Sequence, residues 1–209
     1  MLFNNLIVRD LKIAFYTSTN FLFTSSFFLL ILILIPFIFG SEIDQLKIIF
    51  KGLIWIGISL SILLTLDRIF NSDFDDGNLD IILQSNTSLE LIVCAKFIAH
   101  WITNCLPLIL VLPIIGYLFN LSFFETAPLM LNLAIGSIGM VFIATCVSAL
   151  TLGAKRTIFL KGIITIPLYI PFIIFGVDPY SWPILAALSM IAFVISIFAS
   201  VYSLRLYGE

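Results

Sequence analysis

The sequence predicts an all-α membrane protein with six transmembrane helices, an N-terminal interfacial amphipathic helix and a short cytoplasmic helix between spans 2 and 3. The first observation is composition: 61% of the 209 residues are hydrophobic, 11% are charged, and the mean hydropathy is +1.20. Soluble domains are about half apolar and about a quarter charged. The second observation is that the apolar residues form runs long enough to cross a bilayer, which takes about 20 residues. The third is that acidic residues gather in one short loop.

Six apolar runs are the predicted spans, and together they form a single domain over residues 1–209. The spans cover about residues 20–39, 48–66, 96–119, 127–152, 162–177 and 182–204. The fifth is short and contains Pro167 and Pro171, so we expect a kinked or broken helix there. Pro107 and Pro113 should bend the third span.

The segment before the first span is weakly amphipathic. Asn5, Arg9 and Lys12 share one helical face, while Phe3 and Ile7 lie towards the other. This pattern predicts a helix that lies in the cytoplasmic interface before the chain enters the membrane.

The distribution of lysine and arginine predicts that both termini are cytoplasmic. Short cytoplasmic loops carry an excess of these residues. Lys47 and Lys51 fall on the side opposite the N-terminus. The other eight fall on the same side as the N-terminus: Arg9, Lys12, Arg68, Lys96, Lys155, Arg156, Lys161 and Arg205.

The loop after the second span is the most acidic part of the chain. Five of the twelve acidic residues lie in residues 67–80: Asp67, Asp73, Asp75, Asp76 and Asp80. Gly77 is suited to end an extension of the second helix, and Asn78 can cap a new one. Because so much charge cannot lie in a bilayer, this segment is predicted to be a solvated loop on the cytoplasmic side.

In the new helix, Leu79, Ile82 and Leu83 share a face at i, i+3 and i+4, while Asp76 and Asp80 point elsewhere. A short helix with an apolar ridge and acidic flanks fits a groove on a soluble partner. A solvated connector with no partner is the alternative.

Charge and motif content exclude several function classes. The net charge of −2 offers no basic patch for nucleic-acid phosphates. Cys94, Cys105 and Cys146 form no CxxC pair, so neither a disulfide framework nor a metal site is expected. The sequence has no GxxxxGK[ST] phosphate loop, so the chain should not bind ATP itself. We expect no enzyme activity and no bound cofactor.

His100 is the single histidine, near the cytoplasmic end of the third span. A histidine within a membrane segment can act as a relay or a ligand. Its place beside Trp101 favours an interfacial role or a hydrogen bond to a neighbouring helix. With one histidine and no companion, a metal or haem site wholly inside this chain is not expected.

The fourth span has small or hydroxyl residues in two stripes, which let helices approach closely. Packing within the chain and a dimer seam both fit them. The stripes are Gly136, Ala144 and Ser148, and Ser137, Thr145, Ala149 and Gly153.

Several segments, in order along the chain, resemble one family. A second span leading into Asp67-Arg68 and then Asp76-Gly77-Asn78-Leu79-Asp80, followed by Ala95-Lys96, resembles permeases of the ABC-2 exporter type. Segments 52–56, 95–101, 106–108, 149–153 and 166–176 narrow the resemblance to the haem exporter protein B family, the membrane subunit of cytochrome c maturation.

The resemblance implies six helices in a bacterial inner membrane, or a mitochondrial one if the protein is organellar. The partners that it implies are a separate ABC ATPase subunit, a haem-handling membrane subunit and a haem chaperone. It also implies two copies of this chain per complex, in contact with membrane lipids. In that family the acidic loop forms the coupling helix, which assigns ATPase coupling to Asp76, Gly77, Leu79, Asp80, Ile82 and Leu83.

What such a complex moves is left open by the resemblance. ATP hydrolysis by the partner would drive either haem export or release of the haem-loaded chaperone, and the lack of a haem ligand set in this chain favours release. Two other classes stay as alternatives: an ABC-2 permease for a lipid or polysaccharide, and a membrane scaffold with no transport role.

Overall fold

The computed structural model of the protein describes residues 2–16, 30, 32–35, 43–85, 87–153 and 157–208. Every regular element in these ranges is a helix, which confirms the all-α class. The named helices are α1 (Leu2–Tyr16), α3 (Ile43–Thr65), η1 (Leu66–Arg68), α4 (Asn71–Asp75), α5 (Asn78–Leu83), α6 (Leu89–His100), η2 (Trp101–Cys105), α7 (Leu106–Leu118), α8 (Phe123–Leu150), α9 (Thr157–Gly176) and α10 (Trp182–Gly208).

Five helical segments of the described chain are long and apolar enough to cross a membrane. They are Leu46–Asp75, Leu89–Leu118, Phe123–Leu150, Phe159–Gly176 and Trp182–Tyr207, and they correspond to predicted spans 2 to 6. The first predicted span, residues 20–39, lies outside the described residues except for 30 and 32–35, which are helical. The chain is a multi-pass membrane protein, and the count of six spans stays a prediction.

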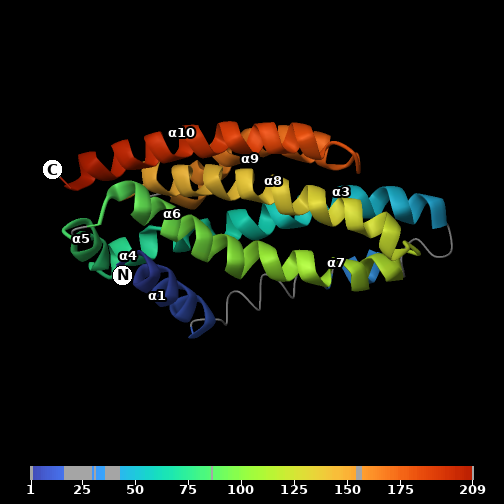
Figure 1. Ribbon diagram of the computed structural model, residues 1–209, viewed down its shortest axis with the longest axis horizontal. Coiled ribbons are helices and arrows are strands. Elements are labelled where there is room, and N and C mark those ends of the chain that lie inside the picture. Colours follow the sequence, from blue (N-terminus) through green and yellow to red (C-terminus); the bar gives the residue numbers. More distant parts are fainter. Residues whose placement is uncertain are drawn as a thin grey trace.

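The long helices run side by side in one elongated bundle (Figure 1). α8 packs most extensively against α10, and also against α9, α7 and α3. α1, α4, α5 and the C-terminal end of α10 gather at one end of the bundle, and the α7–α8 and α9–α10 connections lie at the other (Figure 1). The two ends therefore separate the loops into the same two groups as the lysine and arginine distribution does.

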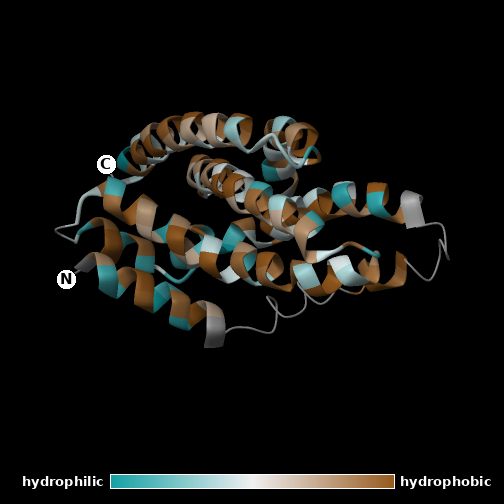
Figure 2. Ribbon diagram, turned by 45° about the vertical axis from the view of Figure 1, so that its right-hand side comes forward, coloured by the Kyte–Doolittle hydropathy of each residue, from teal (hydrophilic) through white to brown (hydrophobic). Residues whose placement is uncertain are grey.

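The outer surface of the bundle suits a hydrocarbon environment. α10 is hydrophobic along most of its length, whereas hydrophilic and hydrophobic residues alternate around α1 (Figure 2). On α9, a stripe of four isoleucines is between 47% and 64% exposed: Ile163, Ile166, Ile170 and Ile174. Their spacing of three or four residues places them on one helical face, which lipid can cover.

The small residues of α8 pack inside the chain. A Cβ added to Gly136 would lie 2.5 Å from Cη2 of Trp55, and one added to Gly139 would lie 2.5 Å from Cε1 of Phe172. The other stripe members within the helix are fully buried: Ser137, Ala144, Thr145, Ser148 and Ala149. The packing interpretation is confirmed, because a face already buried within one chain is not free to form a dimer seam.

The prolines of the fifth span do not interrupt its helix. α9 continues as a single helix through Pro167 and Pro171, so a broken helix is wrong, and a kink there stays a prediction. Membrane helices tolerate proline where surrounding groups satisfy the freed carbonyls. In the third span a π-helical turn, η2, comes directly before Leu106 and Pro107. Proline has no N–H to continue the α-helical pattern, so a wider turn at this point is physically reasonable.

Candidate functional site

The acidic loop between spans 2 and 3 folds into two short helices at one end of the bundle. α4 ends at Asp75, and α5 begins at Asn78. Between them Gly77 has a φ of +70°, a left-handed conformation that glycine adopts without the steric penalty of a Cβ atom. The expected turn at Gly77 is confirmed.

The apolar ridge of α5 faces the chain's own core. Leu79 is 1% exposed and Ile82 is 5% exposed, while Leu83 is partly buried against the same core. The outward face instead carries Asp80 and Ile81, and Ile81 is 70% exposed. This corrects the expectation of an outward ridge, because these side chains fill the space beneath α5 and the exposed surface of the helix is its acidic side.

Asp73 on α4 lies at the centre of a buried charge cluster that joins three helices. It pairs with Lys96 of α6 and, at 3.1 Å, with Arg9 of α1. Asp10 lies 3.0 Å from Lys96 and 2.6 Å from Arg9. Burial by itself would lower the pKa of Arg9, but the hydrogen bonds and charges of Asp10 and Asp73 outweigh it and raise that pKa. The cluster ties α1 to α4 and α6.

A second charge pair joins the loop to the fifth span. Lys161 on α9 is 2% exposed and pairs with Asp67 of η1, which also accepts a hydrogen bond from Nδ2 of Asn71 at 3.3 Å. Sequence reasoning missed both this pair and the Asp73 cluster. The apolar pattern predicts that these two spans begin at residues 96 and 162, whereas the helices begin at Leu89 and Thr157. Charged residues inside membrane helices usually pair with one another. The two lysines at the predicted cytoplasmic ends of these helices could therefore have indicated pairs with the acidic loop.

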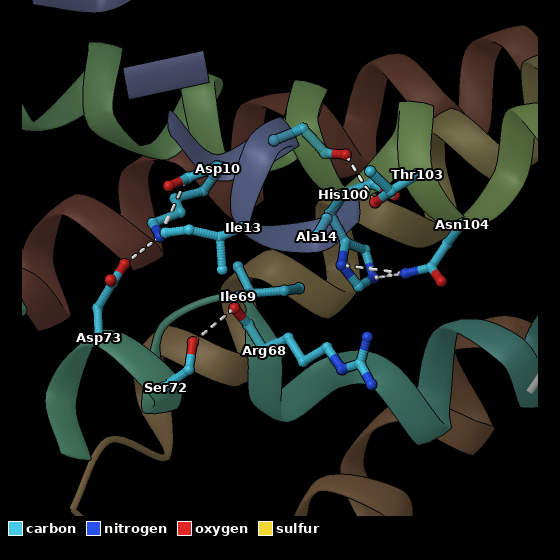
Figure 3. Close-up of a pocket in the computed structure, with 12 residues that line it drawn as sticks. Asp10, Ile13, Ala14, Arg68, Ile69, Ser72, Asp73, His100, Thr103 and Asn104 are labelled. Atoms are coloured by element: carbon cyan, nitrogen blue, oxygen red, sulfur yellow. Dashed lines mark hydrogen bonds and ion pairs between the residues drawn. The ribbon is translucent and has the colours of Figure 1, made fainter. Parts of the chain in front are cut away.

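His100 lies in the wall of a cavity of about 170 Å³, which Asp10, Asp73 and Lys96 of the charge cluster also line (Figure 3). It is 7% exposed, and its Nε2 is 3.0 Å from Nδ2 of Asn104, one turn further along the same span. Asn104 Nδ2 also donates to Oγ1 of Thr65 at 2.8 Å, which joins the second and third spans. His100 therefore bonds within its own span, and Asn104 carries the link between helices.

The family model described as "CcmB protein" matches residues 1–207. The chain belongs to the CcmB protein family. The heme exporter protein B of Bradyrhizobium diazoefficiens is 38% identical over 212 residues, covering 96% of each chain. Its counterpart in Rhodobacter capsulatus is 38% identical over 83% of this chain and 79% of its own. Heme exporter protein B of Escherichia coli K12 is 33% identical over 84% of this chain and 80% of its own.

This CcmB-family chain has two distinct polar features at the α5 end of the bundle. One is the outward acidic face, where Asp76, Gly77 and Asp80 are exposed. The other is the cavity, which His100 lines together with residues of α1. The six residues assigned to coupling therefore divide into three that face outward and three that anchor α5, and His100 is not among the residues of the loop.

Proposed function

We propose that this CcmB-family chain is the membrane permease subunit of an ABC transporter complex for cytochrome c maturation. The match to the family over residues 1–207 carries this proposal. Its relatives are named heme exporter protein B, so haem is the proposed cargo of the complex. ATP-driven release of a haem-loaded chaperone from a haem-handling membrane subunit is the second form of the same role. In both forms a separate subunit hydrolyses ATP, because this chain has no phosphate loop.

The outward face of α4 and α5 is the proposed docking surface for that ATPase subunit. Ile81 is an exposed apolar side chain, and Asp76 and Asp80 are exposed beside it in the same short segment. An apolar anchor within a polar rim is the usual composition of a binding hot spot. The excess of lysine and arginine at this end supports a cytoplasmic position, where ATP is available.

The contacts behind this face support a coupling role rather than a flexible connection. Leu79 and Ile82 are held in the core, so α5 cannot shift without moving the helices beneath it. Asp73 and Asp67 bind partners on α1, α6 and α9. A displacement of the loop by the ATPase would therefore reach three other helices through packed, charged contacts.

Ile81→Asp tests the docking surface. Burying an isoleucine side chain contributes about 1.5–3 kcal/mol, so its loss should weaken ATPase binding about tenfold or more. The measurement is co-purification of the ATPase subunit, together with cytochrome c maturation in cells.

Tyr180→Asp is the matched control, since Tyr180 is 80% exposed in the α9–α10 connection at the opposite end. This control should keep both the ATPase and maturation. If Ile81→Asp also keeps both, the face of α5 is not the docking surface.

The remaining assignments follow from the same role. We place the protein in the bacterial inner membrane, or in the mitochondrial one if it is organellar, with both termini cytoplasmic. The haem-handling subunit and the haem chaperone are the further partners. Two copies per complex stay a prediction, and the stripes of α8 are not their seam because that face is buried inside the chain.

A further inference from the structure

The cavity beside His100 has a wall of two chemical kinds. It lies between α1, the η1–α4 segment and the α6–η2 segment (Figure 3). One part of the wall is apolar and the other carries hydrogen-bonding or charged groups. The apolar part is Ile13, Ala14, Ile69 and Ala99. The charged groups of the wall are Arg68, Lys96, Asp10 and Asp73, and its uncharged polar groups are Ser72, His100, Thr103 and Asn104. Such a wall suits an amphiphile rather than a purely polar solute.

Arg68 is the charged group of this wall with no ion-pair partner among the described residues. The neighbouring carboxylates of Asp67 and Asp73 are each bound by a buried lysine. The half-buried Arg68 side chain extends away from Asp73, towards His100 and Asn104 (Figure 3). A guanidinium presents a planar fork of donors that matches the oxygens of a phosphate or carboxylate.

The charge balance around the cavity is incomplete by one negative charge. The wall itself carries two cations, Arg68 and Lys96, and two carboxylates, Asp10 and Asp73. A third cation, Arg9, pairs with both carboxylates from outside the wall, so Arg68 is the cation that is left over. Both carboxylates are already occupied by cations, so the ammonium group of a zwitterionic headgroup would find no acidic partner here. The site therefore selects for an anion.

We propose that this cavity binds the phosphate of an anionic phospholipid headgroup from the cytoplasmic leaflet. Arg68 holds the phosphate oxygens, and Ile13 and Ile69 pack against the glycerol and the start of the acyl chains. Basic pockets between membrane helices on the cytoplasmic side are established binding sites for anionic lipids. The amphipathic helix α1 forms one side of the cavity, at the level where headgroups lie. The site stands apart from the docking surface, so it does not depend on the proposed ATPase partner.

Native mass spectrometry of the full chain in a neutral detergent tests the site. The probes are phosphatidylglycerol, phosphatidylethanolamine and inorganic phosphate. We expect one saturable molecule of phosphatidylglycerol, with binding at least about tenfold weaker for the other two. Arg68→Gln should weaken phosphatidylglycerol binding about tenfold through loss of charge-assisted hydrogen bonds. Arg205→Gln is the matched control, since Arg205 is exposed on α10 outside the cavity, and should leave binding unchanged.

Ile13→Trp keeps the test decisive if Arg68→Gln fails to fold. Ile13 is 49% exposed on α1, so tryptophan there fills the apolar part of the cavity with Arg68 intact and should also reduce lipid binding. If both variants fold and bind phosphatidylglycerol as the wild type does, the proposal is overturned. If only Ile13→Trp folds, wild-type binding by that variant overturns it. Equal affinity for phosphatidylethanolamine overturns the selectivity for an anionic lipid. Equal affinity for inorganic phosphate overturns the lipid as the source and assigns the site to a free anion.

Discussion

The buried charge cluster predicts that Lys96→Met will destabilise the protein. Methionine fills most of the space of the lysine side chain, so the substitution removes the ammonium group and little packing. Lys96 is 8% exposed and pairs with Asp73 and Asp10, which are 7% and 10% exposed. Without it, Arg9 alone remains to neutralise two buried carboxylates.

The size of the effect follows from this geometry. Removing one partner of a buried ion pair costs about 3–5 kcal/mol. Arg9 still contacts both carboxylates, so we expect a loss of about 3 kcal/mol, near the lower end of that range. For a chain of this length 1 kcal/mol corresponds to about 2–4 °C in Tm, which gives a decrease of about 6–12 °C. The double variant Lys96→Met/Asp73→Asn should recover much of this loss, because it removes both charges together.

Thermal unfolding of the purified protein in detergent, followed by tryptophan fluorescence, measures the change. Lys12→Met is the matched control, since Lys12 is exposed on α1, and its Tm should stay within about 2 °C of the wild type. A Lys96→Met variant that unfolds at the wild-type temperature would refute the cluster as a stabilising element. If the double variant loses as much stability as the two single variants together, or more, the two charges do not stabilise each other as the structure indicates.

Two further predictions concern the loop. Gly77→Val should strain the α4–α5 junction by about 1–2 kcal/mol, because φ is +70° and an added Cβ meets nothing within 4 Å, so backbone strain is the whole effect. Co-purification of the ATPase should fall for Gly77→Val and should persist for Gly77→Asn, since asparagine tolerates this conformation. Equal retention of the ATPase by the two variants would contradict the strain. Cysteines introduced at Asp76 and Asp178 should be labelled by impermeant reagents from the cytoplasmic and the opposite side respectively, and labelling of Asp76→Cys from the outside would reverse the orientation.

The class of the protein and spans 2 to 6 could be predicted from the sequence. The bilayer core imposes a minimum apolar length, and that constraint acts on each segment by itself. The turn at Gly77 could be predicted for a similar reason, because glycine at a helix end signals a local backbone conformation. The family resemblance also rests on segments that can be compared one at a time.

The beginnings of two spans could not be predicted from local pattern. The apolar pattern places Lys96 and Lys161 at the membrane boundary, but each lies inside a helix and pairs with a carboxylate of the acidic loop. Asp10 likewise interrupts the apolar side of α1, and the structure explains it by its contact with Lys96. The interaction that stabilises such a buried charge comes from a residue distant in sequence. The local pattern of one segment therefore predicts the wrong position for the start of the span.

The sequence by itself determined that this is an all-α membrane protein, that α5 has an apolar face, and that α8 has stripes of small residues. Only the tertiary structure decided what covers those faces. Leu79 and Ile82 face the chain's own core and leave Ile81 outward, and Gly136 packs against Trp55. The physical reason is that an apolar or small-residue pattern shows that a face will be buried, whereas the surface that buries it depends on how the whole chain packs.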